Sequence, residues 1–168
     1  MARYLVVANQ TLGGAALERI VRDRIESGEA QFYIVVPTID PKDEATEWDR
    51  GFAISEVGAG DSSVQRTRHA EEEAVRQRET LVGEAHVRAE SRLIQMVQKI
   101  ESAGGKAEGE VGGPEPANTV QDVLARFPFA EVIISTLPAG ISRWLKTDLP
   151  SRVSRVTEVP VTTVEADN

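Results

Sequence analysis

The stretch that decides the fold is FYIVV at residues 32–36, five consecutive apolar residues rich in aromatic and β-branched side chains. YLVVA at residues 4–8 repeats the pattern near the start, and VII at residues 132–134 repeats it later. A strand that is apolar at consecutive positions has to be covered on both faces, which is typical of parallel sheets. We therefore predict three central strands from these runs.

Two further stretches have the pattern of edge strands. KAEGEV at residues 106–111 and PVTTV, from Pro160 to Val164, alternate or carry polar residues, as strands at the border of a sheet do. Apolar residues at helical spacing lie between the strands, for example Leu17, Val21 and Ile25. Strands alternating with helices predict parallel strands joined by right-handed crossovers. The predicted fold class is a doubly wound, mostly parallel five-stranded α/β sheet of order 3-2-1-4-5, similar to a Rossmann fold.

The segment between the second and third predicted strands is longer than the others. Residues 62–102 carry apolar side chains at helical spacing, which predicts one long helix, bent or frayed near Gly83, that ends before Gly104. Its first half is highly charged, so it is either a solvated face or a docking surface for a protein partner. Residues 40–61 are acidic and contain Pro41 and three glycines, which predicts a long loop.

Composition limits the class of protein. A chain of 168 residues has the usual size of one domain, so we expect residues 1–168 to form a single domain. The formal net charge of −8 repels phosphate backbones and argues against a nucleic-acid partner. There is no cysteine, which excludes disulfides and thiolate chemistry. The opening apolar run is too short for a signal peptide or a membrane span, so we predict a cytoplasmic protein without a membrane partner.

A ligand crevice is expected where the chain reverses direction, at the carboxyl ends of strands one and four. Residues 9–14 and 135–147 follow these strands, and both loops lead into helix N-termini, which attract anions. The candidate polar residues are Asn9, Thr11, Ser135, Thr136 and Arg143. A second interpretation stays open: Gly13 and Gly14 open a helix that Thr11 caps, and Arg143 lies on ordinary surface.

In its order of elements the sequence resembles the universal stress proteins, as a divergent member. The similar pieces are YLVVA, YIVVP, a long helix, the stretch GEVGGPEPANTVQDVLARFPFAEVIIST and the terminal PVTTV. The resemblance implies a homodimer, often joined through the last strand, here Pro160 to Val164, and ATP binding in some members. It also implies that Val36 stands where nucleotide-binding members pack a residue on adenine.

The phosphate motif of those members, Gly-x2-Gly-x9-Gly followed by Ser or Thr, is degraded in this chain. Its best match is Leu137, Gly140, Pro150 and Ser151, which keeps one glycine and the hydroxyl. Leucine and proline do not offer the close backbone approach and N–H groups that hold phosphates. Asn9 replaces the acid that the family carries after strand one. No cofactor is certain, and ATP or AMP is disfavoured by the motif.

Catalytic signatures are missing from the sequence. It has no P-loop, dinucleotide or hydrolase motif. His69 and His86 stand about 25 Å apart along the predicted helix, too far to share a metal ion. The leading hypothesis is a non-enzymatic stress-response or regulatory protein that holds a small anionic or nucleotide ligand. The alternatives are a nucleotide-dependent enzyme of related architecture and a docking module that uses the long helix. The roles of Trp48 and Trp144 stay open.

Overall fold

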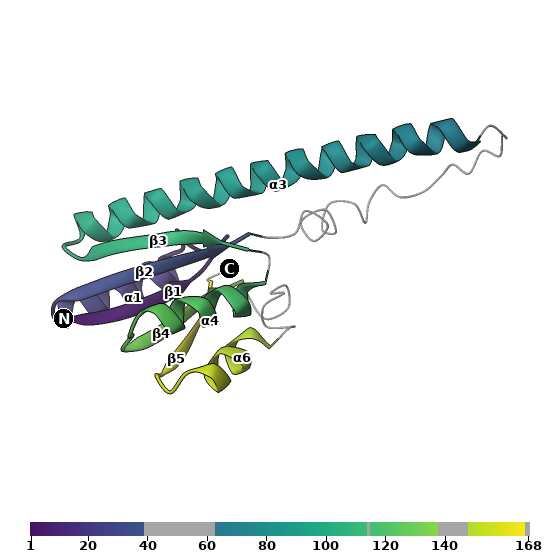
Figure 1. Ribbon diagram of the computed structural model, residues 1–168. Coiled ribbons are helices and arrows are strands. Elements are labelled where there is room, and N and C mark those ends of the chain that lie inside the picture. Colours follow the sequence, from purple (N-terminus) through teal and green to yellow (C-terminus); the bar gives the residue numbers. More distant parts are fainter. Residues whose placement is uncertain (39–62, 114, 138–147, 167–168) are drawn as a thin grey trace. The chain divides into compact units, whose positions relative to one another are not determined.

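The protein contains a five-stranded parallel sheet of order β3-β2-β1-β4-β5, as predicted (Figure 1). A computed structural model describes residues 1–38, 63–113, 115–137 and 148–166. The strands are β1 (Ala2–Val7), β2 (Ala30–Pro37), β3 (Lys106–Gly112), β4 (Glu131–Thr136) and β5 (Val161–Glu165). The described helices are α1 (Ala15–Glu26), α3 (Ser63–Ser102), α4 (Pro116–Arg126) and α6 (Leu149–Val156). The central strands carry the consecutive apolar runs, and the two polar strands lie at the edges.

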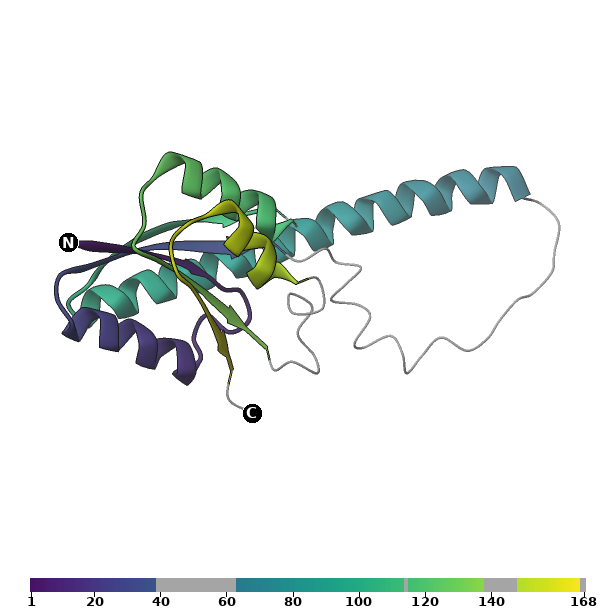
Figure 2. The ribbon, with the colours of Figure 1, turned by 90° about the horizontal axis from the view of Figure 1, so that it is seen from below.

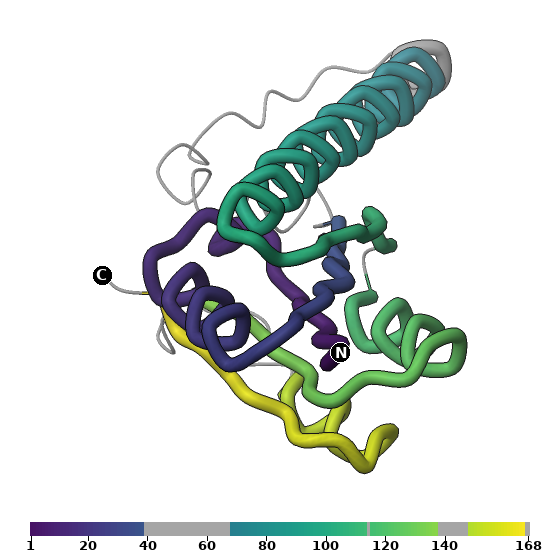
Figure 3. Tube along the Cα trace, turned by 90° about the vertical axis from the view of Figure 1, so that its left-hand side faces the viewer, coloured from purple at the N-terminus to yellow at the C-terminus, as the bar shows by residue number. Residues whose placement is uncertain are grey.

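Helices cover both faces of the sheet, and each face has its own apolar core (Figure 3). On one face α1 and the last turns of α3 pack on alternate side chains such as Val6 and Ile34. On the other face α4 and α6 pack on Leu5, Val7 and Val35. Burial on both faces is the physical reason that the central strands are apolar at every position.

The chain divides into two compact units, residues 1–38 with 88–168 and residues 39–87. The first unit holds the whole sheet and residues 88–102 of α3. In the second unit the structure describes residues 63–87 of the same helix, whose side chains are exposed from residue 68 to residue 84. The helix runs without interruption through Gly83, which confirms the predicted length of α3. The predicted loop at residues 40–61 lies outside the described residues.

β3 approaches its neighbour so closely at one position that only glycine fits. A Cβ atom on Gly109 would lie 2.2 Å from the backbone oxygen of Ile34 and 2.8 Å from Cδ1 of Leu93. The missing side chain therefore lets Leu93 of α3 pack directly on the β2–β3 pair. This contact fixes the end of α3 that belongs to the sheet unit.

The carboxyl ends of β1, β2 and β4 lie side by side. Val7 is in register with Val35 of β2 and with Ile134 of β4. The chain continues from β1 to β2 on one side and returns through β4 and β5 on the other, so the reversal lies between β1 and β4. This is the place where open α/β sheets bind ligands. No helix within the described ranges is long and apolar enough to cross a membrane.

Candidate functional site

Asn9 is the first polar residue beyond β1, and both the nitrogen and the oxygen of its side-chain amide form hydrogen bonds. Its Nδ2 donates a hydrogen bond to the backbone oxygen of Pro37 at 2.6 Å, and its Oδ1 accepts one from Nη1 of Arg92 at 2.5 Å. The residue is 5% exposed. Asn9 therefore joins the carboxyl ends of β1 and β2 to α3.

Thr11 and Ser135 are also paired with each other. The Thr11 hydroxyl donates to the backbone oxygen of Ser135 at 3.1 Å, and the Ser135 hydroxyl donates to Oγ1 of Thr11 at 2.8 Å. The interpretation of Thr11 as a helix cap is wrong, because the N-cap of α1 is Gly14 and no side chain caps this helix. The two hydroxyl groups instead join the loop after β1 to the end of β4.

Two further candidates are buried at the same end of the sheet. Thr136 is 2% exposed, and its Oγ1 has no hydrogen-bond partner among the described residues. Val36 is fully buried in the core that contains Ala8 and Leu12. A buried hydroxyl without a partner is unfavourable, so Thr136 marks a position where another polar group would be stabilising.

The remaining candidates lie beyond β4. Gly140 and Arg143 lie outside the described residues, as do Trp48 and Trp144. Pro150 and Ser151 stand in the first turn of α6, and Ser151 is half-buried. Proline has no N–H, so Pro150 removes one donor from this helix N-terminus.

The sequence interpretation missed Arg92. This residue stands beside the buried stripe of α3 and reaches a side chain 83 residues away in the sequence. Helical periodicity indicates which residues of α3 face the core, and it carries no information on which loop a flanking arginine contacts. The sequence held no signal for this pair.

Two other polar clusters stabilise the sheet away from this end. Arg24 of α1 donates two hydrogen bonds to Glu131 at 2.9 and 3.0 Å, and the hydroxyl of Thr162 donates a third at 2.5 Å. The hydrogen bond from Arg24 is the main reason that the pKa of Glu131 is lowered, against the opposing effect of burial. On the other face Glu110 accepts hydrogen bonds from Tyr33 and Arg126, each at 2.7 Å.

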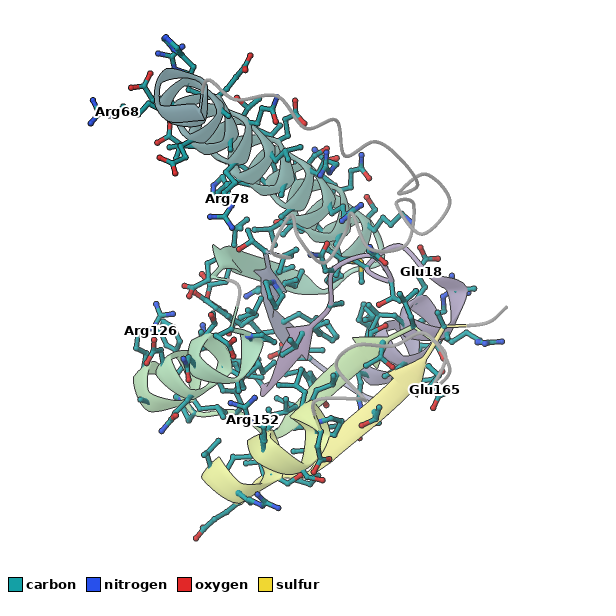
Figure 4. The ribbon with its side chains drawn as sticks, turned by 90° about the vertical axis from the view of Figure 1, so that its right-hand side faces the viewer. Glu18, Arg68, Arg78, Arg126, Arg152 and Glu165 are labelled. Atoms are coloured by element: carbon teal, nitrogen blue, oxygen red, sulfur yellow. The ribbon has the colours of Figure 1, made fainter. Side chains whose placement is uncertain are left out.

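The charged side chains that the structure describes do not gather into a metal site. Figure 4 shows Glu18 on α1, whereas Arg126 and Arg152 lie on α4 and α6, which cover the opposite face of the sheet. Within the described ranges, no group of three or more histidine or acidic side chains could hold a metal ion.

Comparison with known proteins identifies the architecture. No family model matches the sequence, and a search of curated proteins gives no significant match. Among solved structures, a universal stress protein from Lactobacillus plantarum matches with a TM-score of 0.59 at 13% identity, covering 97% of each chain. The chain has the universal stress protein fold.

Two further structures with the universal stress protein fold match over nearly the whole chain. One from Archaeoglobus fulgidus has a TM-score of 0.55 at 13% identity and covers 98% of this chain and 93% of that one. One from Arabidopsis thaliana, solved with AMP bound, has a TM-score of 0.52 at 11% identity and covers 99% of this chain and 93% of that one. Identities this low establish the fold alone.

Proposed function

We propose that this chain is a divergent universal stress protein that acts as a cytoplasmic regulatory homodimer without turnover, and that it holds a small anionic ligand at the carboxyl ends of β1 and β4. The observation that carries the proposal is the fold itself, which covers nearly the whole chain and reverses between β1 and β4. The Arabidopsis neighbour with AMP bound supports a ligand of this class. The proposal includes residues 1–168 as one domain of this family.

Polar residues at the carboxyl ends of β1 and β4 already hydrogen-bond within the chain, which supports a weak nucleotide site. Asn9, Thr11 and Ser135 are each at most 6% exposed and satisfy one another or nearby backbone groups. Pro150 further removes a donor from the first turn of α6. Losing two charge-assisted hydrogen bonds at about 1.5–3 kcal/mol each weakens binding about a hundredfold or more. ATP should therefore bind weakly, with a dissociation constant above the micromolar range.

The homodimer proposal rests on the outer edge of β5. The backbone N–H of Val132 donates to the oxygen of Pro160, and that of Ala166 donates to the oxygen of Thr136. Alternate residues of a parallel strand bond the same neighbour, so Thr162 and Val164 bond β4. Val161, Thr163 and Glu165 direct their N–H and C=O groups outward, where a second copy can pair. Figure 2 shows β5 as the last strand before the C-terminus.

The proposal is tested by mass spectrometry of small molecules released from protein that is purified without added ligand. We expect a small anionic compound in substoichiometric amount. Calorimetry with AMP and ATP then measures affinity, and chromatography after incubation with nucleotides measures turnover, which we expect to be absent. Sub-micromolar ATP affinity that is lost in Gly140→Val would contradict the weak site, and steady product formation would favour the nucleotide-dependent enzyme.

A second candidate function is partner docking through the first half of α3. Val75, Leu81 and Val82 are 45–54% exposed in this segment, although large apolar side chains are normally buried. We expect cross-linking in cells to capture a defined partner with the wild-type protein and with Arg78→Gln. A triple variant, in which Val75, Leu81 and Val82 are replaced by serine, should no longer be cross-linked to this partner. Equal capture by the triple variant would exclude this surface.

A further inference from the structure

Arg92 lies at the carboxyl edge of the sheet and is held there by a rigid element. Its Nη1 stands 2.5 Å from Oδ1 of Asn9, the second residue after β1 ends. Ala89, Met96 and Ile100 of the same helix segment are 1–2% exposed in the core. This packing fixes the backbone of Arg92, and the hydrogen bond to Asn9 restrains its guanidinium, so less side-chain freedom is lost on meeting a ligand.

The group that holds Arg92 is neutral, in contrast to the group that holds a second α3 cation. Lys99 also reaches the β1–α1 connection, because a Cβ atom on Gly13 would lie 3.9 Å from its Nζ. Lys99 forms an ion pair with Glu18, which cancels its charge locally. Arg92 faces the neutral amide of Asn9, and among the described residues it forms no ion pair.

Asn9 is suited to this role in a way that aspartate is not. Its Nδ2 donates to the oxygen of Pro37, which orients Oδ1 toward Arg92. An aspartate would place an acceptor against the Pro37 oxygen and would neutralise the arginine. A guanidinium has five N–H donors in a planar fork, and the contact with Asn9 uses the Nη1 group. Arg92 is partly exposed, so its outer donors can meet a ligand.

A second polar group lies at the same end of the sheet, on its other face. Thr136 stands two residues beyond Ile134 on β4, so its side chain is directed to the same face as Ile134, which α4 and α6 cover. Its buried hydroxyl has no partner among the described residues. A cation held by a neutral group and a buried hydroxyl without a described partner therefore lie at the carboxyl ends of neighbouring strands, on opposite faces of the sheet, in a chain whose net charge of −8 otherwise repels anions.

We propose that Arg92 is a specificity-determining residue of the crevice, which selects ligands that carry a phosphate or another oxyanion over neutral ligands. The inference rests on the proposed function, since it assigns the charge preference of that same crevice. Arginine binds phosphate oxygens through paired hydrogen bonds. Asn9 acts as a positioning residue, because it orients Arg92 without neutralising it.

The experiment is an NMR titration, which measures weak binding, of the full chain with AMP, adenosine and inorganic phosphate. The variants are Arg92→Gln, Arg92→Met and Arg92→Lys, with Arg78→Gln as the control at an exposed arginine of the same helix (Figure 4). We expect the wild-type protein to prefer AMP over adenosine. Arg92→Gln and Arg92→Met should bind AMP about tenfold or more weakly, with adenosine affinity within about twofold. Arg92→Lys should retain most of the preference, and Arg78→Gln all of it.

The outcomes separate this inference from the proposed function. Phosphate binding that disappears in Arg92→Gln supports the inference and identifies the oxyanion as the recognised group. If only AMP binding responds to the substitution, the inference is supported with a nucleoside monophosphate as ligand. Wild-type AMP affinity in both Arg92→Gln and Arg92→Met overturns the role of Arg92 alone, as does an equal loss for AMP and adenosine. A wild-type protein that binds none of the three overturns the proposed function and the inference together.

Discussion

The two edge strands of the sheet have opposite surface chemistry. β3 carries Lys106, Glu108 and Glu110. Glu108 pairs with Arg3 at 2.5 Å, and Glu110 pairs with Arg126 at 2.7 Å. β5 has the sequence VTTVE and no charged side chain before Glu165.

This difference indicates which edge strand can accept another strand. Charged side chains on an edge strand oppose pairing with a second chain, because pairing would desolvate them. β3 has charges that are already engaged within the chain, whereas β5 presents outward backbone groups between uncharged side chains. We therefore expect the proposed self-association to use β5, and the following variants test it.

The largest effect is expected from Thr163→Pro on β5. Proline removes an outward N–H and leaves the bonds from Thr162 and Val164 to β4 in place. The protein should change from a dimer to a monomer of 18.3 kDa in light scattering. Thr163→Val, which keeps the N–H, should remain dimeric. A wild-type mass of 18.3 kDa at every concentration would refute the dimer itself.

A large loss of stability without dissociation is expected from Gly109→Ala on β3. The added Cβ would lie 2.2 Å from the oxygen of Ile34, so β3 or Leu93 has to move. We expect a loss of about 1–3 kcal/mol in the free energy of unfolding, measured in urea. The matched control is Gly83→Ala, where a Cβ meets no atom within 4 Å and the helix gains about 0.5–1 kcal/mol. Equal stability of the two variants would contradict the close approach.

A moderate, pH-dependent effect is expected from Glu131→Gln. This carboxylate holds Arg24 and the Thr162 hydroxyl of β5, and its pKa is lowered mainly by the hydrogen bond from Arg24. A carboxylate with a lowered pKa stabilises the fold above its unfolded pKa, and this stability is lost as pH falls through the folded pKa. Near neutral pH the variant should lose about 1 kcal/mol.

The pH series provides the control for Glu131. Stability measured from pH 7 down to about pH 3 should fall more steeply for the wild-type protein than for Glu131→Gln, so the two curves converge in acid. Parallel curves would mean that Glu131 does not titrate with a lowered pKa.

The smallest effect is expected from Glu108→Gln on β3. Its carboxylate is 53% exposed, and exposed ion pairs contribute about 0–1 kcal/mol. Arg3 also stays in place because its guanidinium lies 4.3 Å from the centre of the Phe127 ring. Urea unfolding should therefore shift by less than about 0.5 kcal/mol. A loss of stability comparable to that of Gly109→Ala would show that the β3 charges stabilise the sheet and do more than oppose strand pairing at its edge.

Sequence patterns predicted the sheet well because burial acts on each strand separately. The runs at residues 4–8, 32–36 and 132–134 indicated β1, β2 and β4, and polar alternation indicated the edges. The sequence patterns predicted the ends of the strands less well. Glu131 is the first residue of β4 although it is charged, because Arg24 neutralises it from α1.

The candidate site was only partly predictable. Position along the chain placed Asn9 and Ser135 at the carboxyl ends of their strands, as the structure does. Their partners depend on tertiary contacts: Asn9 meets Arg92 across 83 residues, and Thr11 meets Ser135 across 124. A local pattern carries no information on such pairs, and the alternative interpretation of Thr11 as a cap of the nearest helix was therefore wrong.

The contact between Thr11 and Ser135 also bears on how fast the protein folds. Each contact of this kind closes a loop of more than a hundred residues, and the chain entropy of that loop is lost before the contact forms. The β1–α1–β2 unit is local, so we expect it to form early, and we expect β4 and β5 to join the sheet later. A high contact order of this kind slows folding. We therefore expect β5 to complete the sheet late, so that the outer edge proposed for self-association becomes available only at the end of folding.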